Sequence, residues 1–323
     1  MNRKGCLAAV ALGFALIASV VGFTWGWWGS SHVERDIAFI VPAGSSLTSV
    51  AHKLEDEGLV VSADSFLLRA RILGSGDPIK AGEFLLPAGA SPATILDTLQ
   101  HGEAIRRFVT IPEGLPSIMV WERLMAEPLL TGEVPVPEEG SVLPESYDFE
   151  RGDTRAAVLA RMQQAMRDTL AELWPKRAPG IAVSSPREAV ILASIVEKET
   201  GVPSERRMVA GLYSNRVRQG MMLQADPTII YPITKGRPLG RRIRQSEIAA
   251  VNGYNTYTMV GLPQGPITNP GRASIEAVLN PAETDALFMV ADGKGGHVFA
   301  STLAEHNANV ARWFAIRRAR GEM

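Results

Sequence analysis

ILASIVEKETG, residues 191–201, is an apolar segment with helical spacing that ends on two glutamates, Glu197 and Glu199, immediately before a glycine. The last turn of a helix carries partial negative charge and ordinarily attracts Lys, Arg or His. Acidic side chains at this end therefore require an explanation, and that explanation bears on both the fold and the chemistry of the chain.

The sequence marks where this helix starts and ends. Ser185 is placed as the N-cap, Pro186 takes the first helical position, and Glu188 completes a capping box. Gly201 is placed at the C′ position that ends a helix. A second amphipathic helix is predicted from about residue 204 to residue 220, and the short turn between the two predicts a helical hairpin.

The two glutamates are predicted to point to different sides of the helix. Glu199 continues a stripe of bulky apolar residues with Leu192 and Ile195, whereas Glu197 continues a stripe of smaller residues. Because residues two apart on a helix point in nearly opposite directions, the pair cannot flank one sugar bond as acid and nucleophile. At most one of them is expected to be a central acid.

The position of Glu199 predicts a carboxyl group that keeps its proton near neutral pH. The helix end alone disfavours a carboxylate by about 0.3–1 kcal/mol, which is less than the roughly 1.36 kcal/mol that one pKa unit represents. Burial against apolar neighbours can raise a pKa much further, and a protonated carboxyl is what a general acid requires. The alternative interpretation of Glu197-Lys198-Glu199 is a solvated helix end.

Composition limits the class of protein. The chain has 323 residues, of which 46% are apolar and 21% charged, and its formal net charge is −1. This length and apolar content predict an anchor plus two or three small domains, each with its own core. A duplex-binding protein normally shows a strong basic excess, so the balance of charge argues against nucleic acid as a partner.

An uninterrupted apolar run, CLAAVALGFALIASVVGFTWGWW, occupies residues 6–28, and no charged residue lies between Lys4 and His32. The run is long enough to cross a bilayer as a helix. Basic residues precede it, which predicts that the amino terminus stays in the cytoplasm and that the rest of the chain lies outside the cytoplasm. Three tryptophans at the far end are expected to lie at the outer interface: Trp25, Trp27 and Trp28.

A cleaved signal peptide is the competing interpretation of this run. No A-x-A cleavage site follows it, and the run is longer than a normal signal core, so an anchor is favoured. Cys6 is the only cysteine and precedes the run, so it is not placed as a lipoprotein cysteine, and the exported part can form no internal disulfide.

Three segments share one pattern, in which an apolar residue, Pro-x-Gly and a short turn precede an apolar-periodic stretch: residues 41–54, 86–99 and 111–124. The pattern predicts a strand end, a tight turn and a short helix, with Ser46 and Ser91 as caps. The segment after these units is rich in Pro, Gly and acidic residues, which predicts a long irregular connection.

The resulting division of the chain has four parts, in an α+β protein. Residues 1–34 form a cytoplasmic tip and transmembrane anchor, residues 35–125 a small α+β region, residues 126–153 a connection, and residues 154–323 the carboxy-terminal domain, which opens with a helix to about residue 173. The α+β region is expected either to bind polymer or to act as a spacer that holds the domain away from the membrane.

Three polar and aromatic loops follow the hairpin: residues 221–231, 254–271 and 290–307. Their composition is typical of loops that line a carbohydrate groove. Tyr254 and Tyr257 are candidates for stacking on sugar rings, and hydroxyl and amide groups are expected to be bound by Gln224, Asn255 and Thr256. Asp226 is the sixth candidate substrate-binding residue.

The motifs SIVEKET, LQADPT, YNTYT, GLPQGPI with NPG, and VADGKGGHVF occur in that order. This series resembles the endolytic murein transglycosylase family of the MltG/YceG type, and the resemblance covers nearly all of the chain from about residue 37. The membrane anchor and a small LysM-like region, matching the Pro-x-Gly units, also fit that family.

The resemblance implies a lysozyme-like catalytic domain that cuts the glycan of peptidoglycan between N-acetylmuramic acid and N-acetylglucosamine. The catalytic glutamate carried over is the one followed by Thr, Glu199, with Glu197 as second choice. Glu199 would protonate the glycosidic oxygen and then help the muramyl 6-hydroxyl attack C1, giving a 1,6-anhydro end. The family and the anchor together suggest a peptidoglycan synthase as a partner in terminating glycan elongation.

Two rival functions stay open at the level of sequence. A muramidase-type hydrolase could use Asp226 as a second acid, although a turn or helix cap would also explain Asp226-Pro227. A noncatalytic peptidoglycan-binding membrane protein would not depend on Glu199. No H-x-x-x-H or H-E-x-x-H spacing occurs, so neither a metal nor any other cofactor is predicted, and GKGGH at residues 293–297 is interpreted as a hairpin turn.

Overall fold

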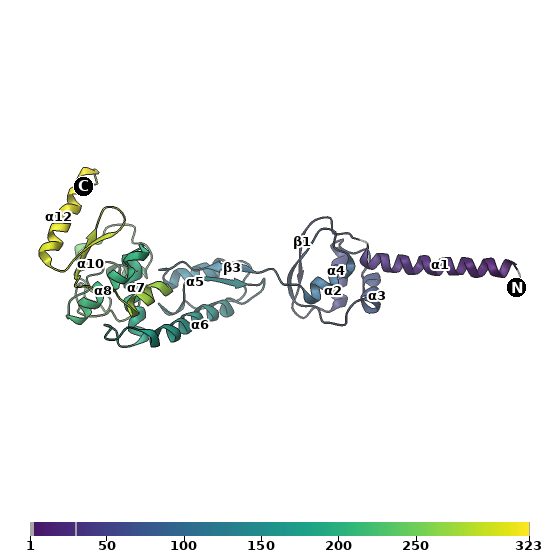
Figure 1. Ribbon diagram of the computed structural model, residues 1–323, viewed down its shortest axis with the longest axis horizontal. Helices are drawn as coiled ribbons and strands as arrows, with labels where there is room; N and C mark the ends of the chain where they lie inside the picture. The colour runs from purple at the N-terminus through teal and green to yellow at the C-terminus, as the bar shows by residue number, and fades with distance from the viewer. Residues whose placement is uncertain (1–2, 30, 323) are drawn as a thin grey trace. The chain divides into compact units, whose positions relative to one another are not determined.

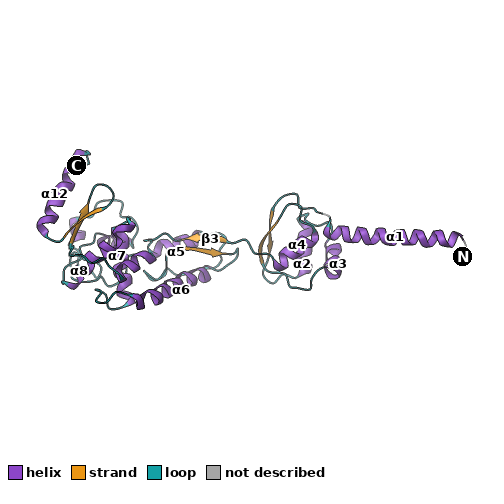
Figure 2. Ribbon diagram, viewed as in Figure 1, coloured by secondary structure: helices purple, strands orange, loops and turns teal. Residues whose placement is uncertain are grey.

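The computed structural model describes residues 3–29 and 31–322, with the backbone alone for residues 3–9, so the side chain of Cys6 and residues 1–2 of the predicted cytoplasmic tip lie outside the description. The chain forms two compact units. The N-terminal unit comprises Met1–Arg107 with Phe149–Gly152, and the C-terminal unit comprises Phe108–Asp148 with Asp153–Met323. Helices and strands are mixed in both (Figure 2).

The N-terminal unit begins with a long helix and continues as a small α+β fold (Figure 1). Its elements are α1 (Arg3–Trp28), β1 (Ile37–Val41), α2 (Leu47–Asp56), α3 (Ala63–Leu73), β2 (Gly82–Leu86) and α4 (Pro92–His101). Within α1, Val10–Trp28 is long and apolar enough to cross a membrane by length and composition. The predicted apolar helix is therefore present, although a signal sequence would pass the same test.

β1 and β2 pair in antiparallel register, with Phe39 opposite Phe84. Both phenylalanines are fully buried, and the helices pack over them to form the core of the unit. Ser46 and Ser91 cap α2 and α4 as the sequence predicted, each accepting a hydrogen bond from a backbone N–H three residues on. Local cap and turn chemistry thus accounts for these strand-turn-helix units.

One of the three interfacial tryptophans departs from its prediction. Trp25 and Trp28 are exposed, but Trp27 is only 2% exposed and lies in the core of the N-terminal unit, with its ring centroid 5.7 Å from that of Phe66. Neighbouring positions on a helix point about 100° apart, so a helix that packs on one side buries one tryptophan of such a group and leaves the others free.

The C-terminal unit carries the remaining elements. They are β3 (Arg107–Thr110), α5 (Ser117–Ala126), β4 (Ser146–Phe149), α6 (Arg155–Leu173), α7 (Pro186–Glu199), α8 (Arg206–Arg218), α9 (Pro227–Thr234), α10 (Gln245–Ile248), α11 (Arg272–Leu279), β5 (Phe288–Ala291), β6 (His297–Ala300) and α12 (Leu303–Ala319), with 3₁₀ turns at Trp174–Lys176 and Pro203–Glu205. β3 pairs with β4, and β5 pairs with β6 in an antiparallel hairpin as the GKGGH motif predicted.

The division into compact units falls after residue 107, and Phe149–Gly152 also belong to the N-terminal unit. The third strand-turn-helix segment, β3 and α5, has the predicted form but packs with the C-terminal unit. The segment predicted as an irregular connection also contains a strand, β4, because SYDF alternates exposed and buried side chains and pairs with β3. Periodicity showed the elements but not which neighbours they pack against.

Asn269, from the NPG motif, holds the early loops of the C-terminal unit to its core. Its Nδ2 donates to the carbonyl oxygen of Leu115 (2.9 Å) and to Ser117 Oγ (3.0 Å), and its Oδ1 accepts from the backbone N–H of Val142 (3.1 Å). The side chain is fully buried. The Asn269 side-chain amide thus provides hydrogen-bond partners for buried polar groups on two separate segments, at residues 115–117 and at Val142.

We expect Asn269→Ala to destabilise the C-terminal unit, because it leaves several buried polar groups without partners, at a cost of about 1–3 kcal/mol each. Thermal unfolding of the full chain in detergent should show a midpoint several degrees lower, since about 1 kcal/mol shifts the midpoint by roughly 2–4 °C in units of this size. Asn307→Ala, at an exposed position on α12, is the control. Equal midpoints for the two variants would contradict this role for Asn269.

Candidate active site

α7 is the central helix of the C-terminal unit. Ser185 caps it by accepting a hydrogen bond from the N–H of Glu188, and residues 189–196 are all buried. The predicted capping box is only half formed. The Glu188 carboxylate accepts from the N–H and hydroxyl of Ser184 and not from the N–H of Ser185. A helix buried on all sides gives its last residues a fixed position.

The end of α7 is held by a chain of hydrogen bonds. Thr200 Oγ1 donates to Glu205 Oε2 (3.1 Å), and Glu205 in turn accepts from the backbone N–H of His297 (2.8 Å) and pairs with His297 Nδ1 (2.8 Å). Burial acts to raise the pKa of Glu205, but the hydrogen bonds from His297 and Thr200 outweigh it and hold that pKa below its ordinary value. These bonds hold Thr200, the residue directly after Glu199, and link it through Glu205 to the GGHVF motif.

Glu199 lines a cavity of about 380 Å³. Its Oε1 is buried and has no hydrogen-bond partner among the described residues, while the Tyr213 hydroxyl is a hydrogen-bond partner of the carboxyl group. Burial, and secondarily the negative charge of Asp226, raise the pKa of Glu199 to about 7, against smaller opposing effects of Tyr213 and Arg216. The prediction that burial raises this pKa is confirmed.

Glu197 has a different environment. Its Oε2 accepts from the backbone N–H of Gly271 (2.9 Å) and its Oε1 lies 3.7 Å from Arg206 Nη2. It does not line the cavity that contains Glu199. The two carboxylates point apart, as their spacing predicted, and the contacts of Glu197 join α7 to the α11 cap and to α8.

Three of the predicted substrate-binding residues line the same cavity as Glu199: Gln224, Asp226 and Tyr257. The Tyr257 hydroxyl donates to Asp226 Oδ1 (2.6 Å). Asp226 is the N-cap residue of α9, the position that the helix-cap interpretation gave it, but its side chain makes no cap hydrogen bond. Gln224 has a positive φ of 52°, which turns the chain at the cavity edge.

The other three predicted substrate-binding residues lie outside this cavity. Asn255 is buried, and its Nδ2 donates to the carbonyls of Ile248 (2.9 Å) and Ala250 (2.7 Å). Thr256 Oγ1 accepts from the N–H of Ala225 (3.0 Å). Tyr254 packs on Tyr231 with ring centroids 4.8 Å apart. These side chains shape the loops instead of facing the cavity, because their polar groups are satisfied within the protein.

Tyr213 and Arg216 were missed as site residues. Tyr213 is buried on α8, and the amphipathic pattern of that helix accounts for its ring but not for its hydroxyl. Burial and the nearby Glu199 raise the pKa of Tyr213 well above its ordinary value, so the hydroxyl keeps its proton and can donate. Arg216 donates from Nη1 to the carbonyl of Leu223 (2.7 Å) and from Nε to that of Leu287 (2.7 Å), which fixes the cavity walls. The signal in the sequence that could have indicated these site residues was Arg216 itself, a charged residue three positions after Tyr213 on the same predicted helix.

A second cavity of about 460 Å³ adjoins the first and shares Lys198 and Pro227 with it. Most of its remaining lining is apolar, including Met119, Ile230 and Leu239. Within the described part of the chain, no group of three or more His, Cys, Asp or Glu side chains is arranged to hold a metal ion. The chemistry available at the cavity is that of a buried carboxyl group with tyrosine, arginine and aspartate around it.

Comparison with known proteins gives the family. Residues 39–312 match the YceG-like family. The chain belongs to the YceG-like family.

Relatives of known name support this membership. An endolytic murein transglycosylase of Bacillus subtilis is 26% identical over 311 residues, covering 85% of each chain. An endolytic murein transglycosylase of Streptococcus pneumoniae is 28% identical over 321 residues, covering 84% of this chain and 57% of that relative. A 2.6 Å crystal structure of a yceG-like protein from Listeria monocytogenes superposes with a TM-score of 0.52 at 26% identity, covering 85% of this chain and 98% of that one.

We expect Glu205→Gln to lower the free energy of unfolding at pH 7 by about 1–3 kcal/mol, because it breaks a charge-assisted link to His297. The folded-state pKa of Glu205 lies below the ordinary 4.5. The contribution of ionised Glu205 to the free energy of unfolding is therefore fully present above pH 4.5 and is lost as the pH falls through the folded-state pKa. In urea unfolding, the free energies of unfolding of wild type and Glu205→Gln should therefore differ strongly at pH 7 and only slightly at pH 3. A difference that is the same at both pH values would contradict an electrostatic role.

Proposed function

We propose that this YceG-like chain is an endolytic murein transglycosylase, which cuts peptidoglycan glycan between N-acetylmuramic acid and N-acetylglucosamine and leaves 1,6-anhydro-muramyl ends. The observation that carries the proposal is the Glu199 carboxyl at the cavity wall, with a buried Oε1 that has no partner in the described part of the chain and a pKa of about 7. A carboxyl group in this state can hold a proton and present it to a bound oxygen. The names of the relatives from two organisms support the choice of substrate.

The proposed reaction uses Glu199 twice. As acid, it gives its proton to the glycosidic oxygen while the bond from that oxygen to C1 breaks. The muramyl 6-hydroxyl then bonds to C1 and gives its proton to the Glu199 carboxylate, so the enzyme returns to its starting state and no water is consumed. A pKa near 7 suits both steps, since a group that donates and then accepts works best near the ambient pH.

The groups around Glu199 have distinct proposed roles. Tyr213, whose hydroxyl is a hydrogen-bond partner of the carboxyl, stabilises the ionised form after the first proton transfer. Asp226 has the opposite effect on the pKa, and its negative charge can also stabilise positive charge that develops at C1. Tyr257 orients Asp226 through the 2.6 Å hydrogen bond, and Gln224 at the cavity edge is placed for sugar amide or hydroxyl groups.

A hydrolase is the second candidate, because the structure brings Asp226 into the same cavity as Glu199. Two carboxyl groups at one site are the arrangement by which retaining and inverting glycosidases hydrolyse sugar bonds. A hydrolase would leave reducing ends on the glycan. A transglycosylase would leave anhydro ends, so the products separate the two.

The remaining parts of the chain receive proposals consistent with this reaction. We propose that α1 is a single-pass anchor in the inner membrane with its amino terminus in the cytoplasm, which would place the catalytic part next to nascent glycan. The α+β part after it would be the LysM-like region, and residues 154–323 the lysozyme-like catalytic domain. A peptidoglycan synthase is the proposed partner, because an anchored cutting enzyme beside a synthase could limit strand length.

The first test is product analysis of purified glycan strands by mass spectrometry. Wild type should produce anhydro-muramyl ends, and Glu199→Gln should produce about 10²–10⁴-fold fewer, since it removes the proton donor. Glu197→Gln is the matched control two residues away, and its amide oxygen can still accept from Gly271 N–H. Loss of anhydro ends only in Glu197→Gln would show that Glu197, and not Glu199, is the acid. Reducing ends from wild type would favour the hydrolase.

The second test is the pH dependence of cleavage by two variants. The protonated form of Glu199 starts the reaction, so activity should decline as the pH rises above about 7. Asp226→Asn removes a negative charge that raises the pKa, so the decline should move to lower pH. Tyr213→Phe removes a hydrogen bond that lowers the pKa, so the decline should move to higher pH. Shifts of the same sign in both variants would exclude Glu199 as the titrating group.

A further inference from the structure

The end of α1 is packed into the N-terminal unit and is not a free tether. Trp27 lies in the core of the unit, and Arg69 of α3 donates from Nε to the carbonyl oxygen of Phe23 (3.0 Å). The Arg69 guanidinium also lies 5.2 Å from the centre of the Phe23 ring. A residue of a small domain thus binds directly to the backbone of the helix proposed as the anchor.

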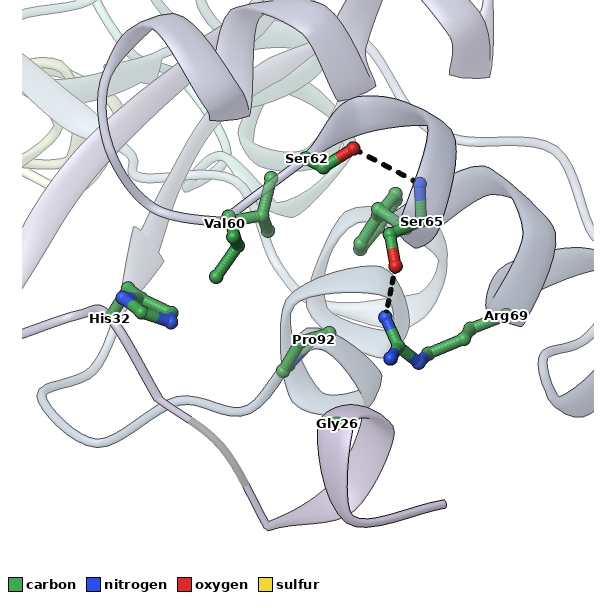
Figure 3. Close-up of a pocket in the computed structure, with 9 residues that line it drawn as sticks. Gly26, His32, Val60, Ser62, Ser65, Arg69 and Pro92 are labelled. Carbon is green, nitrogen blue, oxygen red and sulfur yellow. Dashed lines mark hydrogen bonds between the residues drawn. The ribbon is translucent and has the colours of Figure 1, made fainter. Parts of the chain in front are cut away.

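Gly26 permits this contact. A Cβ atom at Gly26 would lie only 2.6 Å from Arg69 Nη2, so any larger residue would displace the guanidinium. Figure 3 shows Arg69 and its hydrogen-bond partner Ser65 on α3, beside Gly26 on α1, around a cavity of about 240 Å³. The cavity is lined by both helices together with Val60 and Pro92, so α1, α3 and α4 form one packed group.

The length of α1 gives the depth of this contact relative to a bilayer. A hydrocarbon core about 30 Å thick is crossed by about 20 helical residues, so the apolar run at residues 6–28 is long enough to cross it with its tryptophans at the outer edge. Phe23 lies within about a turn and a half of the end of this run, and Arg69 donates to its carbonyl oxygen. The contact therefore places α3 near the outer interface of the bilayer.

The free surface of α3 carries exposed apolar side chains beside the exposed charged residues Asp64 and Arg71. Leu68 and Ile72 are one turn apart and are 53% and 60% exposed, and Val61 in the preceding loop is 73% exposed. Leu68 and Ile72 fall on one face of the helix with Ser65, next to the side that carries Arg69. Three large apolar side chains exposed together on a small unit mark an interaction surface. Trp25 and Trp28 near the end of α1 are also exposed.

We propose that α3 and the loop before it rest on the outer-leaflet lipid surface, with Val61, Leu68 and Ile72 inserted at the boundary between headgroups and acyl chains. The proposal rests on α1 being a membrane anchor. Interfacial helices bury an apolar face about 5–10 Å deep in this region, and continuity with α1 identifies lipid as the occupant. The N-terminal unit is then held at a fixed height, with the β1–β2 sheet on the side away from α1 (Figure 1).

The test measures the depth of single labels in the full chain, reconstituted in vesicles of phosphatidylethanolamine and phosphatidylglycerol. Cys6→Ser removes the native thiol, and a fluorescent label is attached to Leu68→Cys or Ile72→Cys. Leu85→Cys is the matched control, because Leu85 is a 51% exposed leucine on β2 in the same unit. A label at Val20→Cys, 55% exposed on α1, reports whether the anchor is inserted.

Lipids with a nitroxide near the headgroup should quench the labels at positions 68 and 72 at least about threefold more than the label at position 85. Quenching at position 20 with equal, weak quenching at 68, 72 and 85 would overturn the inference and leave the anchor in place. Absence of quenching at position 20 would overturn the anchor itself, and with it the inference. Two independent labelled positions guard against a local effect of either substitution.

Discussion

Burial of the Glu199 carboxyl group is the constraint on which the rest of the C-terminal unit depends. An ionised carboxylate with a buried, unpartnered oxygen is costly, and the protein reduces the cost by raising the pKa to about 7. That state requires the end of α7 to stay where it is. The buried body of α7 and the Thr200–Glu205–His297 chain of hydrogen bonds supply the rigidity.

The opposite treatment of two neighbouring acids follows from the same geometry. Glu197 has an arginine and a backbone N–H as partners and joins helices. Glu199 lines a cavity, and its buried Oε1 has no hydrogen-bond partner among the described residues. Residues two positions apart on one helix thus receive a structural role and a proposed catalytic role. The placement of the carboxylate at a helix C-terminus, unfavourable by itself, adds to the effect of burial.

Much of this could be predicted from local sequence, and the failures share one cause. The Ser46, Ser91 and Ser185 caps, the β5–β6 hairpin and the divergence of the two glutamates follow from residues close in sequence. Asn255 and Thr256 looked like ligand-binding residues because only the folded structure shows that their polar groups bind backbone atoms of other segments. Tyr213 and Arg216 were missed, and Trp27 was placed wrongly, for the same reason: tertiary packing decides which neighbours a side chain contacts.

The central claim is that burial raises the pKa of the Glu199 carboxyl to about 7 in the resting protein, so that a large fraction of it holds a proton at neutral pH. Infrared difference spectroscopy tests this most directly. The protonated-carboxyl carbonyl band present in wild type and missing in Glu199→Gln is followed as the pH is changed in the absence of substrate. The account predicts that this band is lost with a midpoint near pH 7. A midpoint near the ordinary value of 4.5 would show that Glu199 is ionised at neutral pH and would contradict the account.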